Sequence, residues 1–333
     1  MNSFERVIGA VNFQKIDKIP VFPQIFGHAA ILNGIPLDQY IQNGELIADC
    51  QLNALKKYGH DAVFTVIDVN VETEALGSEL LYRKNQYAVI NKYALSDKNN
   101  IDKLKVPDPE NSGRMPEMLK AIKILRSKLK NDIIINGCVL GPMTLATQLL
   151  GIENALYMII DEKNRFEKIL DFTCDVLIRF GIAQISAGAH LPIVFDPSAS
   201  PAVIPHKLFR DLEAPRLKRL FSSLKDAGAI ANWLHIAGPT ESIMTYYDEI
   251  GVNIANFDYC VKPQDAIDKL PGICLDGNIK SLSFIESKPD EIQLQACQLI
   301  EAFDKRGGFI LSSGCEIPPE SRADNIYAMV NYN

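Results

Sequence analysis

Short apolar segments alternate with helical segments along this chain of 333 residues, and that alternation constrains the fold more than any other feature. Each apolar segment is rich in Val, Ile, Leu or Phe, as buried parallel strands are. Eight such strands are predicted, at residues 19–24, 62–67, 132–138, 191–195, 231–235, 253–257, 273–276 and 309–312. Alternating strands and helices form either a doubly wound sheet or a closed barrel. The strand number and the polar residues at most strand ends favour the α/β class and a (β/α)8 TIM barrel.

Two further segments complete the predicted architecture. Residues 3–13 are predicted to form a helix with Ser3 as its N-cap, and this helix is expected to cap the barrel. Residues 69–93 contain alternating segments broken at Gly77 and at Lys84, which predicts a β-hairpin insertion after the second strand. No repeat or linker divides the sequence, so residues 1–333 are predicted to form a single domain.

Polar side chains follow almost every predicted strand. The carboxyl ends of all strands in a parallel barrel meet on one face, where the active sites of this fold collect. The residues at these ends are Asp68, Asn136, Asp196, His235, Asp258, Asp276, Asn278, Ser312 and Cys315, together with His28 after the first strand. Any one of them alone is as readily explained as a helix cap. As a set they predict one polar pocket.

These strand-end residues are predicted to divide into two roles. Asp196, His235 and Asp276 are the predicted catalytic residues, because of their positions at strand ends. The predicted substrate-binding residues are His28, Asp68, Asn136, Asp258, Asn278 and Ser312. Asp196 precedes a proline and Asp276 precedes a glycine, so a structural role in turns stays open for both.

The imidazole of His235 and the thiol of Cys315 suggest a metal site, because zinc binds both groups and a catalytic site needs three protein ligands. Cys274 is the predicted third ligand, since it shares the inward face of its strand with Asp276. Glu74 is the alternative. A buried core position is the more frequent role of a free cysteine such as Cys274. The competing hypothesis is a site without metal, in which His235 donates a hydrogen bond or acts as a general acid.

Composition restricts the partners and the location. Acidic residues outnumber basic ones by 41 to 34, and the net charge is −7, which argues against a nucleic-acid-binding surface. No apolar run approaches the length of a signal-peptide core or a membrane span, so no membrane is expected as a partner. Seven scattered cysteines indicate reduced thiols and a cytoplasmic protein. Whether the protein forms a homodimer stays open from the sequence.

Several motifs carry a resemblance to a known family. They are residues 1–21, 71–77, 141–142, 195–200, 235–238 and 276–278, and the most specific is Leu-Ser-Ser-Gly-Cys-Glu-Ile-Pro-Pro at 311–319. The sequence resembles the uroporphyrinogen decarboxylase superfamily and, within it, the branch of cobalamin-dependent methyltransferases. This resemblance covers nearly the whole chain. It implies a TIM barrel that accepts or delivers a methyl group at the cobalt of a corrinoid held by a separate partner protein.

The resemblance also implies a zinc site with one altered position. In the coenzyme M branch, a His-x-Cys pair and a distant cysteine hold zinc, which keeps a bound thiol as a reactive thiolate. The matching positions here are His235, Ala237 and Cys315, so the first thiolate is absent. The resemblance therefore favours a tetrahydrofolate-type methyl acceptor, or a methyl ether or amine donor, over coenzyme M. Zinc is expected only if Cys274 or Glu74 completes the site.

Two other functions stay open from the sequence. Decarboxylation of uroporphyrinogen requires a site for eight carboxylates, whose natural partners are clustered arginines. The true decarboxylases place an arginine-rich segment after the first strand, whereas residues 21–28 contain no arginine here. The third hypothesis is a non-catalytic, corrinoid-binding relative.

Overall fold

A computed structural model describes residues 1–332 and contains a barrel of eight parallel strands. They are β1 (Val21–Phe22), β2 (Ala62–Phe64), β5 (Ile134–Leu140), β6 (Leu191–Phe195), β7 (Trp233–His235), β8 (Ile254–Asn256), β9 (Cys274–Ile279) and β10 (Phe309–Ser313). Their order in the sheet is β1-β10-β9-β8-β7-β6-β5-β2. The amide of Asp61, just before β2, donates to the carbonyl of Val21 in β1 at 3.0 Å, which brings the two ends of this order together. The predicted (β/α)8 fold is confirmed.

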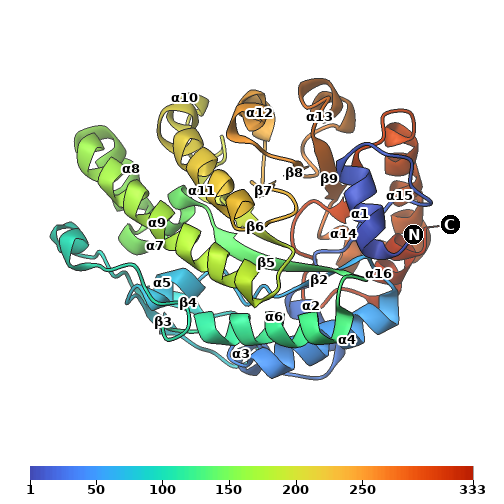
Figure 1. The fold of residues 1–333 in the computed structure, drawn as a ribbon, viewed down its shortest axis with the longest axis horizontal. Helices are drawn as coiled ribbons and strands as arrows, with labels where there is room; N and C mark the ends of the chain where they lie inside the picture. Colours follow the sequence, from blue (N-terminus) through green and yellow to red (C-terminus); the bar gives the residue numbers. More distant parts are fainter. Residues whose placement is uncertain (333) are drawn as a thin grey trace.

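Helices connect the strands and surround the barrel (Figure 1). They are α1 (Ser3–Val11), α2 (Gly27–Leu32), α3 (Leu37–Tyr40), α4 (Gly44–Tyr58), α5 (Val71–Ala75), α6 (Met115–Leu129), α7 (Pro142–Leu150), α8 (Ile152–Asp161), α9 (Lys163–Ala187), α10 (His206–Leu208), α11 (Ala214–Asp226), α12 (Tyr247–Ile250), α13 (Pro263–Lys269), α14 (Ser283–Glu286), α15 (Pro289–Phe303) and α16 (Ala323–Val330). Short 3-10 helices lie at η1 (Lys98–Lys103), η2 (Pro197–Ala199), η4 (Thr240–Ser242) and η5 (Met244–Tyr246), and a short π-helix lies at η3 (Phe209–Glu213).

Local sequence signals set several of these helix boundaries. The side chain of Asn43 accepts hydrogen bonds from the backbone amides of Glu45 and Leu46 in the first turn of α4. Gly59 ends that helix with a φ of 75°. Within residues 1–332 no single helix is long and apolar enough to span a membrane. The pair α7 and α8 meets that test of length and composition only jointly, across a bend of 107°.

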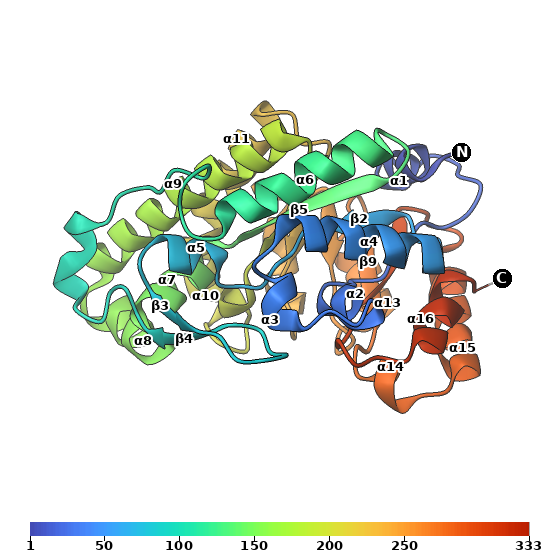
Figure 2. The ribbon, with the colours of Figure 1, turned by 90° about the horizontal axis from the view of Figure 1, so that it is seen from below.

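The insertion after β2 differs from the prediction in its first part. The antiparallel hairpin consists of β3 (Glu79–Leu81) and β4 (Val89–Lys92), whereas residues 71–75 form helix α5. Acidic side chains in the first turn favour this helix, and the carboxylate of one of them, Glu72, is buried and accepts the Leu140 amide at 3.0 Å. The hairpin is therefore confirmed only for residues 79–92. Figure 2 shows the hairpin and α8 on the side of the molecule away from α1.

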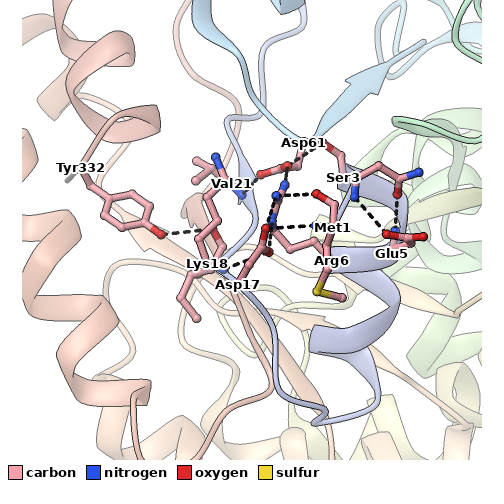
Figure 3. Close-up of polar contacts among 11 residues, drawn as sticks. Met1, Ser3, Glu5, Arg6, Asp17, Lys18, Val21, Asp61 and Tyr332 are labelled. Atoms are coloured by element: carbon pink, nitrogen blue, oxygen red, sulfur yellow. Dashed lines mark hydrogen bonds and ion pairs between the residues drawn. The ribbon is translucent and has the colours of Figure 1, made fainter.

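Helix α1 contacts residues that precede the strands, at the amino end of the barrel. The guanidinium of Arg6 contacts Asp61 at 2.6 Å and Asp17 at 2.9 Å (Figure 3). The bond from Arg6 lowers the pKa of Asp17. Asp61 also accepts the amide of Val21 at 2.9 Å, so one carboxylate joins α1, β1 and β2. The helix ends at Val11, two residues before its predicted end, and these contacts leave the opposite end of the barrel for a binding site.

Aromatic side chains fill the barrel interior. The rings of Phe22, Phe64 and Trp233 pack against one another with centroids 5.5 to 6.4 Å apart. Toward the carboxyl end, Phe26 and Phe195 form an edge-to-face pair at 5.9 Å. An eight-stranded barrel is only wide enough to be filled by side chains, so space for a ligand lies above these rings.

Candidate active site

A cavity of about 190 Å³ lies at the carboxyl end of the barrel. Its lining comes from the segments around the ends of β1, β2, β6, β7 and β10 and from the hairpin: Phe26, Val66, Ile67, Asp68, Val69, Asn70, Tyr87, Ala88, Phe195, Pro197, His235, Ala237, Cys315 and Glu316. Such a mainly apolar lining with a few polar groups is usual for a small-ligand site. A larger hollow of about 470 Å³ beside α8 contains none of the predicted site residues. The cavity at the barrel end is therefore the candidate active site.

The structure brings His235 and Cys315 to this one cavity. The imidazole of His235 lies against the ring of Phe195, with centroids 4.6 Å apart, because the two residues pair across β6 and β7. Both imidazole nitrogens are buried without a partner among the described residues. Burial lowers the pKa of His235 to about 3 and raises that of Cys315 to about 11, so both side chains are uncharged near neutral pH. A ligand in the cavity can therefore form hydrogen bonds with the imidazole of His235 and the thiol of Cys315.

Glu316 follows Cys315 and faces the same cavity. The hydroxyl of Tyr87, on the hairpin loop, donates to Glu316 Oε1. The amide of Gly27 donates to the Tyr87 oxygen at 2.8 Å and to Glu316 Oε1 at 3.3 Å. Burial raises the pKa of Glu316 to about 7. A Cβ at position 27 would collide with the Tyr87 hydroxyl, so this glycine allows the hairpin to close over the cavity.

Asp68 reaches the cavity from the segment after β2 and is held by a buried ion pair. Arg114 Nη1 donates to Asp68 Oδ2 at 2.6 Å, and Nη2 donates to Oδ1 at 3.1 Å. The same guanidinium donates through Nε to Glu74 Oε2 at 2.7 Å, and Tyr82 donates to Glu74 Oε1 at 2.7 Å. Bidentate geometry of this kind is among the stronger polar contacts in proteins. Arg114 therefore orients the Asp68 carboxylate from behind the cavity wall.

Asp276, Asn136 and Ser312 lie inside the barrel and do not line the cavity. Asn256 donates to Asp276 Oδ2 at 2.9 Å, whereas Oδ1 has no partner among residues 1–332. Burial raises the pKa of Asp276 to about 7. Both polar atoms of Asn136 are also buried without a partner in the described chain, while Ser312 donates to the Phe22 carbonyl at 2.7 Å. A role for these three residues in the reaction stays a prediction.

Asp196 points away from the cavity, although its neighbours Phe195 and Pro197 line it. Its Oδ1 accepts the amide of Thr144 at 2.8 Å and the hydroxyl of Thr144 at 2.7 Å. Thr144 belongs to the first turn of α7, where backbone amides lack partners within the helix. Burial raises the pKa of the Asp196 carboxyl. This geometry supports the structural alternative for Asp196, and its catalytic role stays a prediction.

The remaining predicted residues bond to neighbouring loops. Asp258 accepts the amide of Gly238 at 2.7 Å, which ties the segment after β8 to the segment after β7. Asn278 donates to the Val261 carbonyl at 2.9 Å. His28 contacts the hydroxyl of Tyr58 at 2.8 Å and the carbonyl of Pro319 at 2.9 Å. None of the three lines the cavity, so a contact with substrate stays a prediction for each.

Comparison with known proteins decides the family. The model of the uroporphyrinogen decarboxylase (URO-D) family matches residues 2–333, which is almost the whole chain. The chain belongs to the uroporphyrinogen decarboxylase family. It is an enzyme of this family.

Named relatives within the uroporphyrinogen decarboxylase family include enzymes of two kinds. Methylcobamide:CoM methyltransferase MtaA of Methanosarcina barkeri is 28% identical, over 98% of this chain and 95% of that protein. Uroporphyrinogen decarboxylase of an Anaeromyxobacter species is 21% identical, over 98% of this chain and 97% of that protein. The solved structure of a methyltransferase from Methanosarcina mazei superimposes with a TM-score of 0.91 at 25% identity and covers 100% of this chain and 98% of its own.

The zinc site expected for this member of the uroporphyrinogen decarboxylase family lacks its third ligand. His235 and Cys315 line the cavity with Ala237, whereas Cys274 is buried deeper in β9, two residues before Asp276. The alternative ligand, Glu74, is engaged by an arginine and a tyrosine. Within residues 1–332 no group of three or more His, Cys, Asp or Glu side chains is arranged to hold a metal ion. The residues present do not fit a three-ligand zinc site.

Most of the cavity-lining residues were not among the sequence predictions, and four cavity or supporting residues illustrate why. Glu316 is adjacent to Cys315 in the most specific motif, so its position alone could have indicated it. Phe26 follows the first strand, but an apolar residue there carries no functional signal. Tyr87 and Arg114 are distant from every barrel strand end in the sequence, and only the folded hairpin and the start of α6 bring them to the site.

Proposed function

We propose that this enzyme transfers a methyl group between a small methylated compound and the cobalt of a corrinoid carried by a partner protein. The cavity is the observation behind this proposal: it is small, mainly apolar and located at the carboxyl end of the barrel. A volume of about 190 Å³ is below that of cavities that enclose drug-sized ligands, so a corrin must remain at the mouth while the small molecule enters. Similarity to a methylcobamide:CoM methyltransferase supports this function.

The side chains around the cavity suit the handling of a methyl group. In the donor direction, the bond between the methyl carbon and its heteroatom breaks, the heteroatom keeps the electron pair, and reduced cobalt supplies the pair for the new bond. Phe26 and Phe195 exclude water from the methyl carbon. The imidazole of His235 and the thiol of Cys315 are free to bond to the heteroatom side of the substrate.

The lining favours some of the predicted substrates over others. A methyl ether or amine donor suits a cavity of this volume better than a tetrahydrofolate-type acceptor. Coenzyme M carries a sulfonate, and the acidic side chains that line the cavity are Asp68, which is paired with Arg114, and Glu316, whose pKa is raised to about 7 by burial. The described lining contains no lysine or arginine to serve as a counter-ion for a sulfonate.

Decarboxylation of uroporphyrinogen is the alternative, favoured by the 21% identical relative. A substrate with eight carboxylates requires cationic partners, yet no lysine or arginine occurs among the cavity-lining residues of the described chain. Arg114 is 7% exposed and already paired with Asp68. The decarboxylase function therefore has less support than methyl transfer.

Absorption spectra of the cobalt test the proposal directly. The enzyme is incubated with reduced cobalamin and a panel of methyl ethers and methylated amines, and in the reverse direction with methylcobalamin and candidate acceptors. Methyl transfer is expected to convert the spectrum of one cobalt state into the other only when enzyme and substrate are both present. Release of carbon dioxide from uroporphyrinogen would instead support the alternative. Binding of cobalamin without any transfer would support the non-catalytic relative.

A further inference from the structure

We propose that the methyl-bearing substrate of this cavity is a small quaternary ammonium compound, held by aromatic rings and by the carboxylate of Glu316. This inference rests on the proposed function, because it names the class of the methyl donor. Three features of the cavity support it: the aromatic lining, the distribution of charge and the nature of the leaving group.

Aromatic rings line the cavity from several sides. Phe26 comes from the segment after β1, Phe195 from the end of β6, and Tyr87 from the hairpin loop. The rings of Phe26 and Phe195 meet edge to face at an angle of 84°. A cation close to an aromatic face is attracted by the ring quadrupole, and quaternary ammonium groups are the ligands that aromatic cages bind best. A neutral group packs against the same rings but lacks this electrostatic attraction, and an anionic group is repelled by the ring quadrupole.

The charge around the cavity is also suited to a cation. Asp68 and Glu316 are the acidic groups in the lining, and the described lining contains no lysine or arginine. The guanidinium of Arg114 is shared between Asp68 and Glu74, so one positive charge faces two carboxylates. Glu316 has a different environment, because its two donors, the Tyr87 hydroxyl and the Gly27 amide, are uncharged. Glu316 therefore presents a carboxyl group to the cavity without a protein cation, and a bound ammonium group would be its counter-ion.

The leaving group of a quaternary ammonium donor is a neutral amine, which suits the uncharged side chains of His235 and Cys315 in the cavity. When the bond between a methyl carbon and a quaternary nitrogen breaks, the nitrogen keeps the electron pair and leaves as a neutral tertiary amine. Reduced corrinoid cobalt supplies the electron pair for the new bond to carbon. The step consumes no proton, whereas a methyl ether would leave as an alkoxide and require one. A cavity that offers a neutral imidazole and a thiol can release a neutral amine without further proton transfer.

Binding of three compounds that share a compact, methyl-rich centre and differ in charge tests this assignment without any corrinoid. Calorimetry at pH 8, above the pKa of about 7 of Glu316, compares tetramethylammonium with neopentyl alcohol, which is neutral, and with pivalate, which is anionic. Tetramethylammonium is expected to bind about 2- to 30-fold more tightly than neopentyl alcohol, and pivalate is expected to bind most weakly. Glu316→Gln and Phe195→Leu should each reduce binding of the cation by a factor in that range. Binding of neopentyl alcohol should change less, and it also reports that the cavity of each variant is folded.

A matched control removes a carboxylate from the same loop. Glu320 is exposed and does not line the cavity, and its charge has the smallest of the effects on the pKa of Glu316, so Glu320→Gln should change the three affinities far less than Glu316→Gln changes the affinity for the cation. Equal or tighter binding of neopentyl alcohol or pivalate would overturn the assignment, as would equal losses for cation and alcohol in Phe195→Leu. Methylation of cobalt by ethers in an enzyme without cation preference would overturn it while the proposed function stands. Selective binding of tetramethylammonium without methylation of cobalt would support the site and count against methyl transfer.

Discussion

Replacing Arg114 by alanine tests how strongly the ion pair behind the cavity stabilises the protein. The side chains of Arg114 and Asp68 are 7% and 2% exposed, and their closest nitrogen and oxygen atoms are 2.6 Å apart. Removal of one partner from a buried ion pair costs about 3–5 kcal/mol, because the other charge remains buried without compensation. With a urea m-value of about 3 kcal/mol/M, the midpoint of urea unfolding should fall by about 1 M or more. Circular dichroism during urea unfolding measures this shift.

Two further variants show whether the ion pair is the cause. Arg179 lies 3.7 Å from Asp108, and both side chains are 50% exposed, so Arg179→Ala should cost less than about 1 kcal/mol. The double variant Arg114→Met with Asp68→Asn removes both charges and should recover part of the stability lost in Arg114→Ala. If Arg114→Ala shifts the midpoint no more than Arg179→Ala, or if the double variant recovers nothing, the ion pair does not stabilise the site in this way.

Two other expected outcomes concern metal binding and pH. Ala237→Cys places a thiol beside the imidazole and the thiol of the cavity, so metal analysis after dialysis should find about one zinc ion per chain in the variant and much less in the wild type. Equal zinc contents would contradict this. His60 is buried, and burial lowers its pKa from 6.5 to about 3, so between these values the unfolded chain binds a proton that the folded chain does not. Stability should therefore fall as the pH decreases below 6.5, by up to about 1.4 kcal/mol per pH unit from this group. Urea unfolding should show a smaller loss between pH 7 and pH 5 for His60→Leu than for the wild type, and an equal loss would exclude this contribution.

Much of the barrel could be predicted because its strands are short, apolar and separated by helices. Predicted and observed bounds agree for residues 191–195 and nearly so for 309–312, where burial on both faces requires a continuous apolar run. Boundaries were less certain at 19–24, of which only Val21 and Phe22 pair with a neighbour. Residues 71–75 were assigned to the hairpin although they form a helix. The segment is too short for its periodicity to separate the two structures. A tertiary contact decides between them, because the Glu72 carboxylate accepts the amide of Leu140 at the end of β5.

The candidate site shows more clearly what could not be predicted from the sequence. Position at a strand end is a property of the sequence, and it was sufficient to select Asp68, His235 and Cys315, which line one cavity. The direction of a side chain is not such a property, because it depends on which neighbour offers a better partner. Asp196 turns toward Thr144 since the amides of a helix terminus need an acceptor.

The sequence by itself determined the barrel and the end at which the candidate cavity lies, and its resemblance to the coenzyme M branch indicated the alanine at 237 in place of a cysteine. Only the tertiary structure decided the size of the cavity and the charge around it. The hairpin brings Tyr87 to Glu316, and the start of α6 brings Arg114 to Asp68, across separations of 229 and 46 residues. Contacts over such separations depend on how the inserted loop folds back over the barrel, and no local pattern of residues encodes them. The physical reason is that a strand end follows from local periodicity, whereas the environment of a buried carboxylate follows from every segment that packs around it.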